Sequence, residues 1–175
     1  MRRWSIGLGA AFVVLVALYW VGVRNSTVEP RLKSLQPAAV IGAGSDAVAV
    51  SKDGQILAWL PLSDDQSLPS LPLSTPPKGG KLEGPVLQQA RVLGAAPAAL
   101  RPYLESSYYG ETGVDVRLRS GIELRFGDAS QAGAKWKAAA AVLADPSITA
   151  LDYVDLHAPG RPAVGGSGHT LPPVE

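Results

Sequence analysis

The stretch GVDVRLRSGIELRFGDASQAGAKWKAAAAVLADPSITALDYVDLHAPGRPAV, residues 113–164, decides the fold. On both sides of Arg119-Ser120-Gly121, apolar residues occupy every second position, which is the pattern of two β-strands. A three-residue loop with Gly121 in the left-handed conformation would place apolar residues opposite one another: Leu118 and Ile122, Val116 and Leu124, Val114 and Phe126. The same register sets Arg117 opposite Glu123 and Asp115 opposite Arg125. We therefore expect a hairpin with one buried face and one charged face.

A helix is predicted after this hairpin. Ser130 or Asp128 is a candidate cap, and Asp145-Pro146 is a stop signal. Apolar residues between these limits follow helical spacing, namely Trp136, Ala140 and Leu143. The segment is rich in alanine, so we expect it to pack closely on the sheet.

Two further strands are predicted after the helix. Residues 149–157 carry apolar side chains on both faces, as expected of an inner strand. Asp155 interrupts them, and a buried carboxylate there needs a partner, for which Arg125 or Lys135 is available. The last strand comprises Arg161, Pro162, Ala163 and Val164, and it belongs at a sheet edge because Pro162 has no N–H to donate. Such an edge is a place where a partner can add a strand.

The first part of the folded region predicts a second hairpin and a short helix. Residues 47–51 and 55–59 flank Asp53-Gly54, and a type I′ turn there would pair Val50 with Leu57 and Val48 with Trp59. The proline-rich residues 61–84 predict an extended loop. Pro85 at a first helical position and Gly94 at the end delimit an amphipathic helix.

The N-terminal segment predicts a membrane anchor. Residues 4–23 contain no charged side chain, and twenty helical residues rise about 30 Å, the thickness of a bilayer core. Aromatic residues stand near the ends of the span, and small residues within it would admit a second helix: Trp4, Tyr19 and Trp20; Gly7 and Gly9. An uncleaved anchor is favoured over a signal peptide because the apolar run is long and no A-x-A site follows.

Composition and motifs exclude most chemistry. The chain has 175 residues, a formal net charge of +1 and no cysteine, which argues against nucleic acid, disulfides and thiol catalysis. Neither histidine has a partner at metal-ligand spacing, and no constellation for catalysis, cofactor binding or a small-molecule substrate is found. Gly42 and Gly44 lie in a G-x-G-x-x-A match that permits an alternative, a membrane-anchored nucleotide-binding protein or enzyme. That alternative needs a helix after Gly44, whereas the following residues suit a strand and a turn.

Several segments together resemble the β domain of FtsQ/DivIB cell-division proteins. They are Gln36-Pro37-Ala38-Ala39-Val40, Val50-Ser51-Lys52-Asp53-Gly54, Leu71-Pro72-Leu73, Ser120-Gly121-Ile122-Glu123-Leu124-Arg125-Phe126-Gly127, Lys135, and Tyr153-Val154-Asp155-Leu156-His157 through Pro162-Ala163-Val164. The resemblance implies a non-enzymatic divisome scaffold in the plasma membrane, with a cytoplasmic N-terminus, an extracytoplasmic domain and enrichment at the septum. It also implies partners of the FtsB and FtsL type, docked on the last strands. The POTRA domain that such proteins normally carry has no counterpart between Val23 and Gln36.

The predicted organisation is an α+β fold. A transmembrane helix is followed by a mostly antiparallel sheet domain covered by two or three helices. The expected boundaries are 1–24 for the cytoplasmic tail and anchor, 25–36 for a linker, 37–164 for the β domain and 165–175 for a flexible tail. Structural roles are assigned to Asp53, Gly54, Gly121, Gly127 and Asp155, and partner binding to Arg161, Pro162, Ala163 and Val164.

Overall fold

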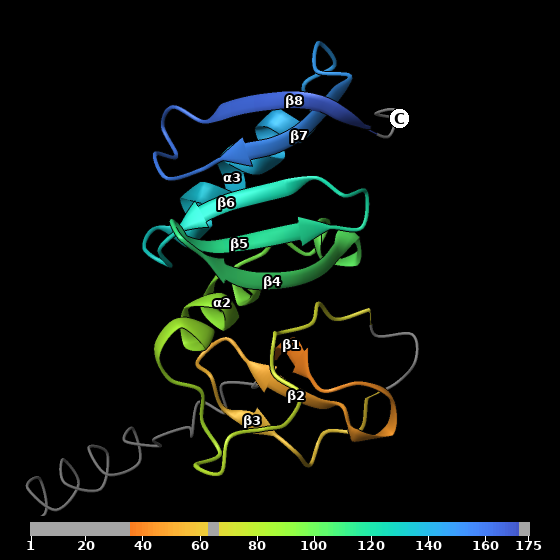
Figure 1. Ribbon diagram of the computed structural model, residues 1–175, viewed down its shortest axis with the longest axis vertical. Coiled ribbons are helices and arrows are strands. Elements are labelled where there is room, and N and C mark those ends of the chain that lie inside the picture. The colour runs from red at the N-terminus through yellow and green to blue at the C-terminus, as the bar shows by residue number, and fades with distance from the viewer. Residues whose placement is uncertain (1–35, 63–66, 172–175) are drawn as a thin grey trace, which may run out of the picture. The chain divides into compact units, whose positions relative to one another are not determined.

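The computed structural model describes residues 36–62 and 67–171 (Figure 1). Two helices and two sheets confirm the predicted α+β class. The predicted membrane helix, residues 4–23, lies outside the described residues. Within them, no helix combines the length and apolar composition needed to cross a bilayer. The elements are β1 (Pro37–Ile41), β2 (Val48–Ser51), β3 (Ile56–Leu57), α2 (Gly84–Gly94), β4 (Leu104–Gly110), β5 (Gly113–Leu118), β6 (Glu123–Gly127), α3 (Ala132–Leu143), β7 (Ala150–Asp155) and β8 (Ala163–Thr170), with short 3-10 turns at Gly44–Asp46 and Arg101–Tyr103.

The β5–β6 hairpin has the predicted three-residue loop. The Leu118 N–H donates to the Ile122 carbonyl at 2.8 Å, and the Gly121 N–H donates to the Leu118 carbonyl at 2.9 Å. Gly121 has a φ of +93°, a conformation that glycine adopts without strain. The predicted pairs follow from this loop: Val116 with Leu124, Arg117 with Glu123 and Asp115 with Arg125.

The far end of this hairpin departs from the prediction by one residue. Val114 pairs with Gly127 instead of Phe126, because a β-bulge interrupts the ladder there. Gly127 adopts a φ of +71°, and a Cβ on it would lie 2.5 Å from the ring of His157. The bulge leaves Phe126 in the core, where its ring centroid is 4.8 Å from that of Trp136.

The β2–β3 hairpin corrects the predicted type I′ turn. Its loop has three residues, Lys52–Gly54, with the Gly54 N–H donating to the Ser51 carbonyl at 2.9 Å. The pairs are therefore Val50 with Ile56 and Ala49 with Leu57, one residue from the predicted register. Gly54 supplies a φ of +80°. Trp59, predicted opposite Val48, is instead 69% exposed.

The extended segment around Ser70 connects the two sheets. The Val40 N–H donates to the Pro69 carbonyl and the Leu71 N–H to the Val40 carbonyl, both at 2.9 Å. On its other side, Ser70 forms a parallel bridge to Ser106 of β4. The prolines limit this pairing to a few residues, as expected. The segment nevertheless links β1 to β4 through backbone hydrogen bonds, and its Leu71 is buried.

Helix α3 connects β6 to β7, which run parallel, and lies behind them in Figure 1. Its Trp136 is fully buried, and the indole N–H donates to the Val92 carbonyl of α2 at 2.7 Å. The predicted caps are wrong: the N-cap is Gln131, with a φ of +51° and no side-chain capping bond. Asp128 instead accepts hydrogen bonds from Ser130 and Lys135.

Lys135 ties α3 to the bulged end of β6. Its Nζ is buried and donates to the Phe126 carbonyl at 2.8 Å, to the Asp128 carbonyl at 3.1 Å and to the Asp128 carboxylate at 2.8 Å. An ammonium group has three donors, so this set satisfies all of them. The β-bulge removes ladder partners at this point, and Lys135 supplies a replacement.

Replacing Lys135 with methionine should therefore destabilise the fold. The variant keeps the apolar stem but leaves the buried Phe126 carbonyl without its donor, a loss of about 1–3 kcal/mol in the free energy of unfolding. Urea denaturation followed by circular dichroism measures it. Lys137→Met is the matched control, because Lys137 is exposed on the same helix. Equal stabilities for the two variants would contradict the assigned role of Lys135.

Candidate functional site: the C-terminal edge strand

Strand β8 forms one edge of the five-stranded sheet, whose order is β4-β5-β6-β7-β8. It pairs antiparallel with β7, and Figure 1 shows it as the outermost strand. No other strand pairs with β8 within residues 36–62 and 67–171. The predicted arrangement of an inner strand followed by an edge strand is thus what the sheet contains. Alternate N–H and C=O groups of an edge strand point away from the sheet and are open to a further strand.

The four residues predicted for partner binding divide between a turn and the strand. Ala163 pairs with Asp155 and Val164 pairs with Val154. Arg161 and Pro162 precede the strand, in a turn where the Arg161 N–H donates to the Ala158 carbonyl at 2.9 Å. Pro162 has no N–H to contribute, and the ladder begins immediately after it.

The strand continues to Thr170, where the sequence predicted a flexible tail from Gly165 onward. His169, expected in that tail, pairs with Leu151, and its ring packs so closely on Gly121 that a Cβ there would lie 2.4 Å from its Cε1 atom. The glycines of this segment suggest disorder by composition, but here they make room for Tyr153 and Asp152 of β7. The correction moves the end of the folded domain at least six residues past Val164.

A bulge at Gly166–Gly168 divides β8 into two parts. The register shifts between the Tyr153–Gly165 and Leu151–His169 pairs, so three residues of β8 face one residue of β7. That residue is Asp152, whose carboxylate accepts the Gly168 N–H at 2.7 Å. The uninterrupted ladder at the start of β8 is therefore the three residues Ala163–Gly165.

The helix-side face of the sheet reaches the edge at Val164. The row Val116, Leu124 and Val154 is fully buried, and Val164 continues it with 45% of its surface exposed. An apolar side chain at an open edge loses water contact when another strand is added.

On the opposite face, charged and aromatic side chains form a connected network. The Arg125 guanidinium donates to the Glu123 carboxylate at 2.7 Å and lies 4.0 Å from the centroid of the Tyr153 ring. Glu123 also accepts the Tyr108 hydroxyl. Burial and this bond to Glu123 raise the pKa of Tyr108 to about 12. The network links side chains of three strands, β4, β6 and β7.

Among the residues the structure describes, the Asp155 carboxylate forms no ion pair with Arg125 or Lys135, the predicted partners. Its Oδ1 accepts the His157 backbone N–H at 3.0 Å and contacts the His157 Nδ1 at 2.7 Å. Partial burial acts to raise the pKa of Asp155, but the hydrogen bonds from His157 outweigh it and lower this pKa. The bond to Asp155 in turn raises the pKa of His157. The side chain of Asp155 is 40% exposed, so no buried partner is required.

Asp115 is the buried carboxylate that sequence reasoning missed. It is 6% exposed, and its Oδ1 has no hydrogen-bond partner among the residues the structure describes. Burial, followed by the nearby Glu123 carboxylate, raises the pKa of Asp115 from 3.8 to about 6. A Cβ on Gly110 would lie 2.7 Å from Asp115 Oδ2, so the glycine allows the backbone of β4 to lie close to this carboxylate. In the sequence, Asp115 alternates with apolar residues in the same way as Arg117 does, so the pattern predicts an exposed side chain for both.

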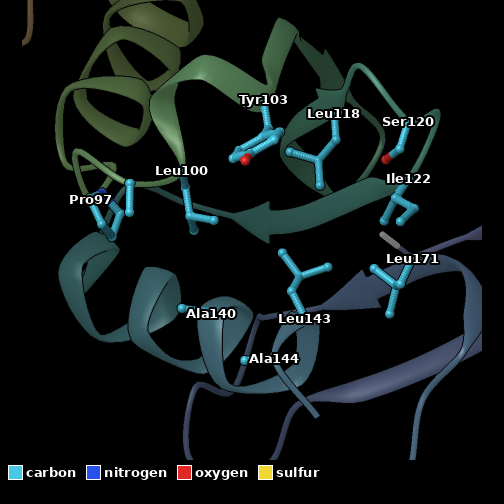
Figure 2. A pocket seen from close by; sticks show the side chains of 11 residues that line it. Pro97, Leu100, Tyr103, Leu118, Ser120, Ile122, Ala140, Leu143, Ala144 and Leu171 are labelled. Atoms are coloured by element: carbon cyan, nitrogen blue, oxygen red, sulfur yellow. The ribbon is translucent and has the colours of Figure 1, made fainter. Parts of the chain in front are cut away.

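An apolar hollow of about 390 Å³ lies on the helix side of the sheet (Figure 2). It is bounded by the end of α3, the turn before β4, the β5–β6 loop and the residue after β8; its larger side chains are Leu100, Tyr103, Leu118, Ile122, Leu143 and Leu171. None of its lining residues is charged. Its lining contributes two side-chain hydroxyls, those of Tyr103 and Ser120, and no carboxylate, amine or imidazole.

The nucleotide alternative fails at Gly44. A dinucleotide fingerprint needs the N-terminus of an α-helix at the second glycine, so that its amides bind the pyrophosphate. The chain instead makes a single 3-10 turn, Gly44–Asp46, and enters β2 at Val48.

Comparison with known families decides the assignment. Residues 39–157 match the family model described as cell division protein FtsQ/DivIB, C-terminal. The chain belongs to the FtsQ/DivIB family. No curated protein matches it. FtsQ/DivIB proteins are non-enzymatic cell-division proteins that take part in protein interactions of the divisome. The FtsQ/DivIB match begins at Ala39, within β1, and ends at His157, after β7, so β8 lies beyond it.

Substituting Gly166 tests the bulge in β8. Its φ is +79°, and a Cβ would lie 2.0 Å from Asp152 Oδ2, so Gly166→Ala introduces strain and displaces the carboxylate. We expect a loss of about 1–3 kcal/mol in the free energy of unfolding. Gly133→Ala is the control, because its site on α3 is open and alanine favours a helix. Thermal melts of both variants provide the measurement, and an unchanged melt for Gly166→Ala would rule out the described bulge.

Asp115→Asn should change how stability depends on pH. Because the folded-state pKa of Asp115 is raised to about 6 from 3.8, its ionisation opposes folding, and its contribution to wild-type stability falls as pH rises from about 4 to about 6. Asparagine does not ionise, so the variant gains about 1–3 kcal/mol relative to wild type above pH 6 and nothing below pH 4. Urea denaturation at pH 4 and pH 8 measures this difference. A gain of the same size at both values would indicate a packing effect instead.

Proposed function

We propose that this FtsQ/DivIB protein is a single-pass membrane scaffold of the division machinery that docks partner proteins on the edge of β8. The family assignment supports a role in division, and the sequence of residues 4–23 supports an anchor with the domain outside the cytoplasm. Partners of the FtsB and FtsL type and enrichment at the septum follow from the family resemblance. The scaffold carries out no reaction of its own.

The observation that carries the docking proposal is the open ladder at Ala163–Gly165. An added strand there would form backbone hydrogen bonds with groups that β7 does not use. It would also cover Val164, whose row of neighbours is otherwise fully buried. Backbone pairing supplies affinity, and the exposed valine adds apolar burial at the centre of the contact.

Val164→Asp should impair division while leaving the domain folded. An aspartate at this position places an unpaired charge where an added strand would remove water, so we expect partner binding to weaken at least about tenfold. Tyr109→Asp is the control, because Tyr109 is equally exposed, at 45%, and lies on β4, at the opposite end of the strand order from β8.

The measurement is complementation of cells depleted of the protein, with microscopy and co-purification of divisome partners. Depleted cells should form filaments. Wild type and Tyr109→Asp should restore division and Val164→Asp should not, with unchanged circular dichroism for each purified chain. Division without the protein would overturn the divisome role. Full rescue and full co-purification by Val164→Asp would overturn docking at β8.

A further inference from the structure

The outer face of the sheet carries a row of alternating charge that ends at β8. Asp115 pairs with Arg125, Arg125 with Asp155, and Asp155 with Ala163. Neighbouring strands of a sheet bring such residues side by side on one face, where opposite charges stabilise the pairing. Ala163 contributes only a methyl group, so β8 places no positive charge beside Asp155 at this position.

Arg125 does not neutralise the acidic end of this row. Its guanidinium is bound to Glu123 at 2.7 Å and stacked on Tyr153 at 4.0 Å. Three carboxylates, two guanidinium groups and one imidazole share the face: Asp115, Glu123 and Asp155, with Arg117, Arg125 and His157. Asp155 is the carboxylate of this row nearest to the edge, because its register partner on β8 is Ala163. Its side chain is 40% exposed, so its negative charge is accessible to an added strand.

Asp155 is within reach of a strand added beyond β8. Both hydrogen bonds from His157 end on Oδ1, and within residues 36–62 and 67–171 no donor bonds to Oδ2, which can accept from another chain. A residue opposite Ala163 on a new strand would stand two strand spacings from Asp155, about 9.5 Å. The four-carbon stem of lysine or the longer side chain of arginine can cross the Ala163 methyl, whereas short polar side chains cannot.

The residues around Ala163 define the remaining pattern. Val164 faces the helix side and favours an apolar neighbour, while the bulge at Gly166–Gly168 ends the regular ladder. Arg161 lies in the turn before the strand, outside the paired residues. The edge thus offers a short register with one accessible carboxylate, that of Asp155, on its outer side and an apolar helix side.

We propose that this edge selects an extended partner segment with lysine or arginine opposite Ala163 and an apolar residue opposite Val164. The proposal rests on docking at β8 and adds the chemistry of the partner. It assigns Asp155 as a specificity-determining residue, in addition to its bond with His157.

Two fluorescein-labelled peptides test the partner chemistry by fluorescence anisotropy with the full chain in non-ionic detergent. Both are nine-residue alternating sequences with valine on one face; the other face is all lysine in one and all glutamate in the other, so the test does not depend on strand direction. We expect the lysine peptide to bind about three- to tenfold more tightly, and less so in high salt. The net charge of the chain is +1, so overall charge does not favour that peptide.

Three variants locate the effect. Asp155→Asn keeps the acceptor for His157 and should remove most of the preference for lysine. Glu105→Gln, an exposed carboxylate neutralised on β4, should retain it. Val164→Asp should weaken both peptides.

Each outcome separates the partner chemistry from docking itself. Equal binding of the two peptides, or a lysine preference that survives Asp155→Asn, overturns the basic partner but leaves docking intact provided that Val164→Asp weakens both. Binding that is insensitive to Val164→Asp, or no binding of either peptide at millimolar concentration, overturns docking at this edge together with the partner assignment.

Discussion

The register of the β5–β6 hairpin is the constraint on which the rest of the sheet depends. Side chains alternate between faces with period two, so a slip of one residue would send every apolar side chain to the charged face. The loop at Arg119–Gly121 holds Val116 opposite Leu124, and β7 extends that pair with Val154. Each later strand inherits the same sorting. The apolar and charged rows that meet β8 at Val164 and Ala163 begin at this loop.

The sequence predicts this sorting well because both hairpin strands alternate without interruption. It also places the last strand at an edge, because Pro162 lacks a donor. The β2–β3 loop was mispredicted although it has the same form: Lys52–Gly54 and Arg119–Gly121 both end in a glycine with positive φ. In the β5–β6 hairpin, the opposing side chains distinguish a three-residue loop from a two-residue loop. The short β3 offers only two ladder pairs, which is too few to make that distinction.

Bulges account for most of the remaining differences. Hydropathy patterns report which face a residue occupies but not where an extra residue enters a ladder. Gly127 shifts the end of β6 by one position, and Lys135 satisfies the carbonyls around it. The sequence of Gly166–Gly168 likewise predicts a flexible tail, because the segment has no apolar side chains of its own. It is held in the sheet by the hydrogen bond from the Gly168 N–H to Asp152 of β7. Asp155 was expected to be buried for a related reason: its strand looked covered on both faces, but its outer face is partly open.

An open strand edge can pair with unintended chains and lead to aggregation, and β8 combines access with restriction. A long, flat edge would pair with any extended chain, including a second copy of itself. Here the proline before the strand and the bulge after Gly165 leave only three regular positions between them. So short a ladder forms few backbone hydrogen bonds, and these alone give little discrimination between partners. Specificity must then come from side chains beside the ladder, which is why an exposed valine on one face and a carboxylate on the other matter more here than on a longer edge.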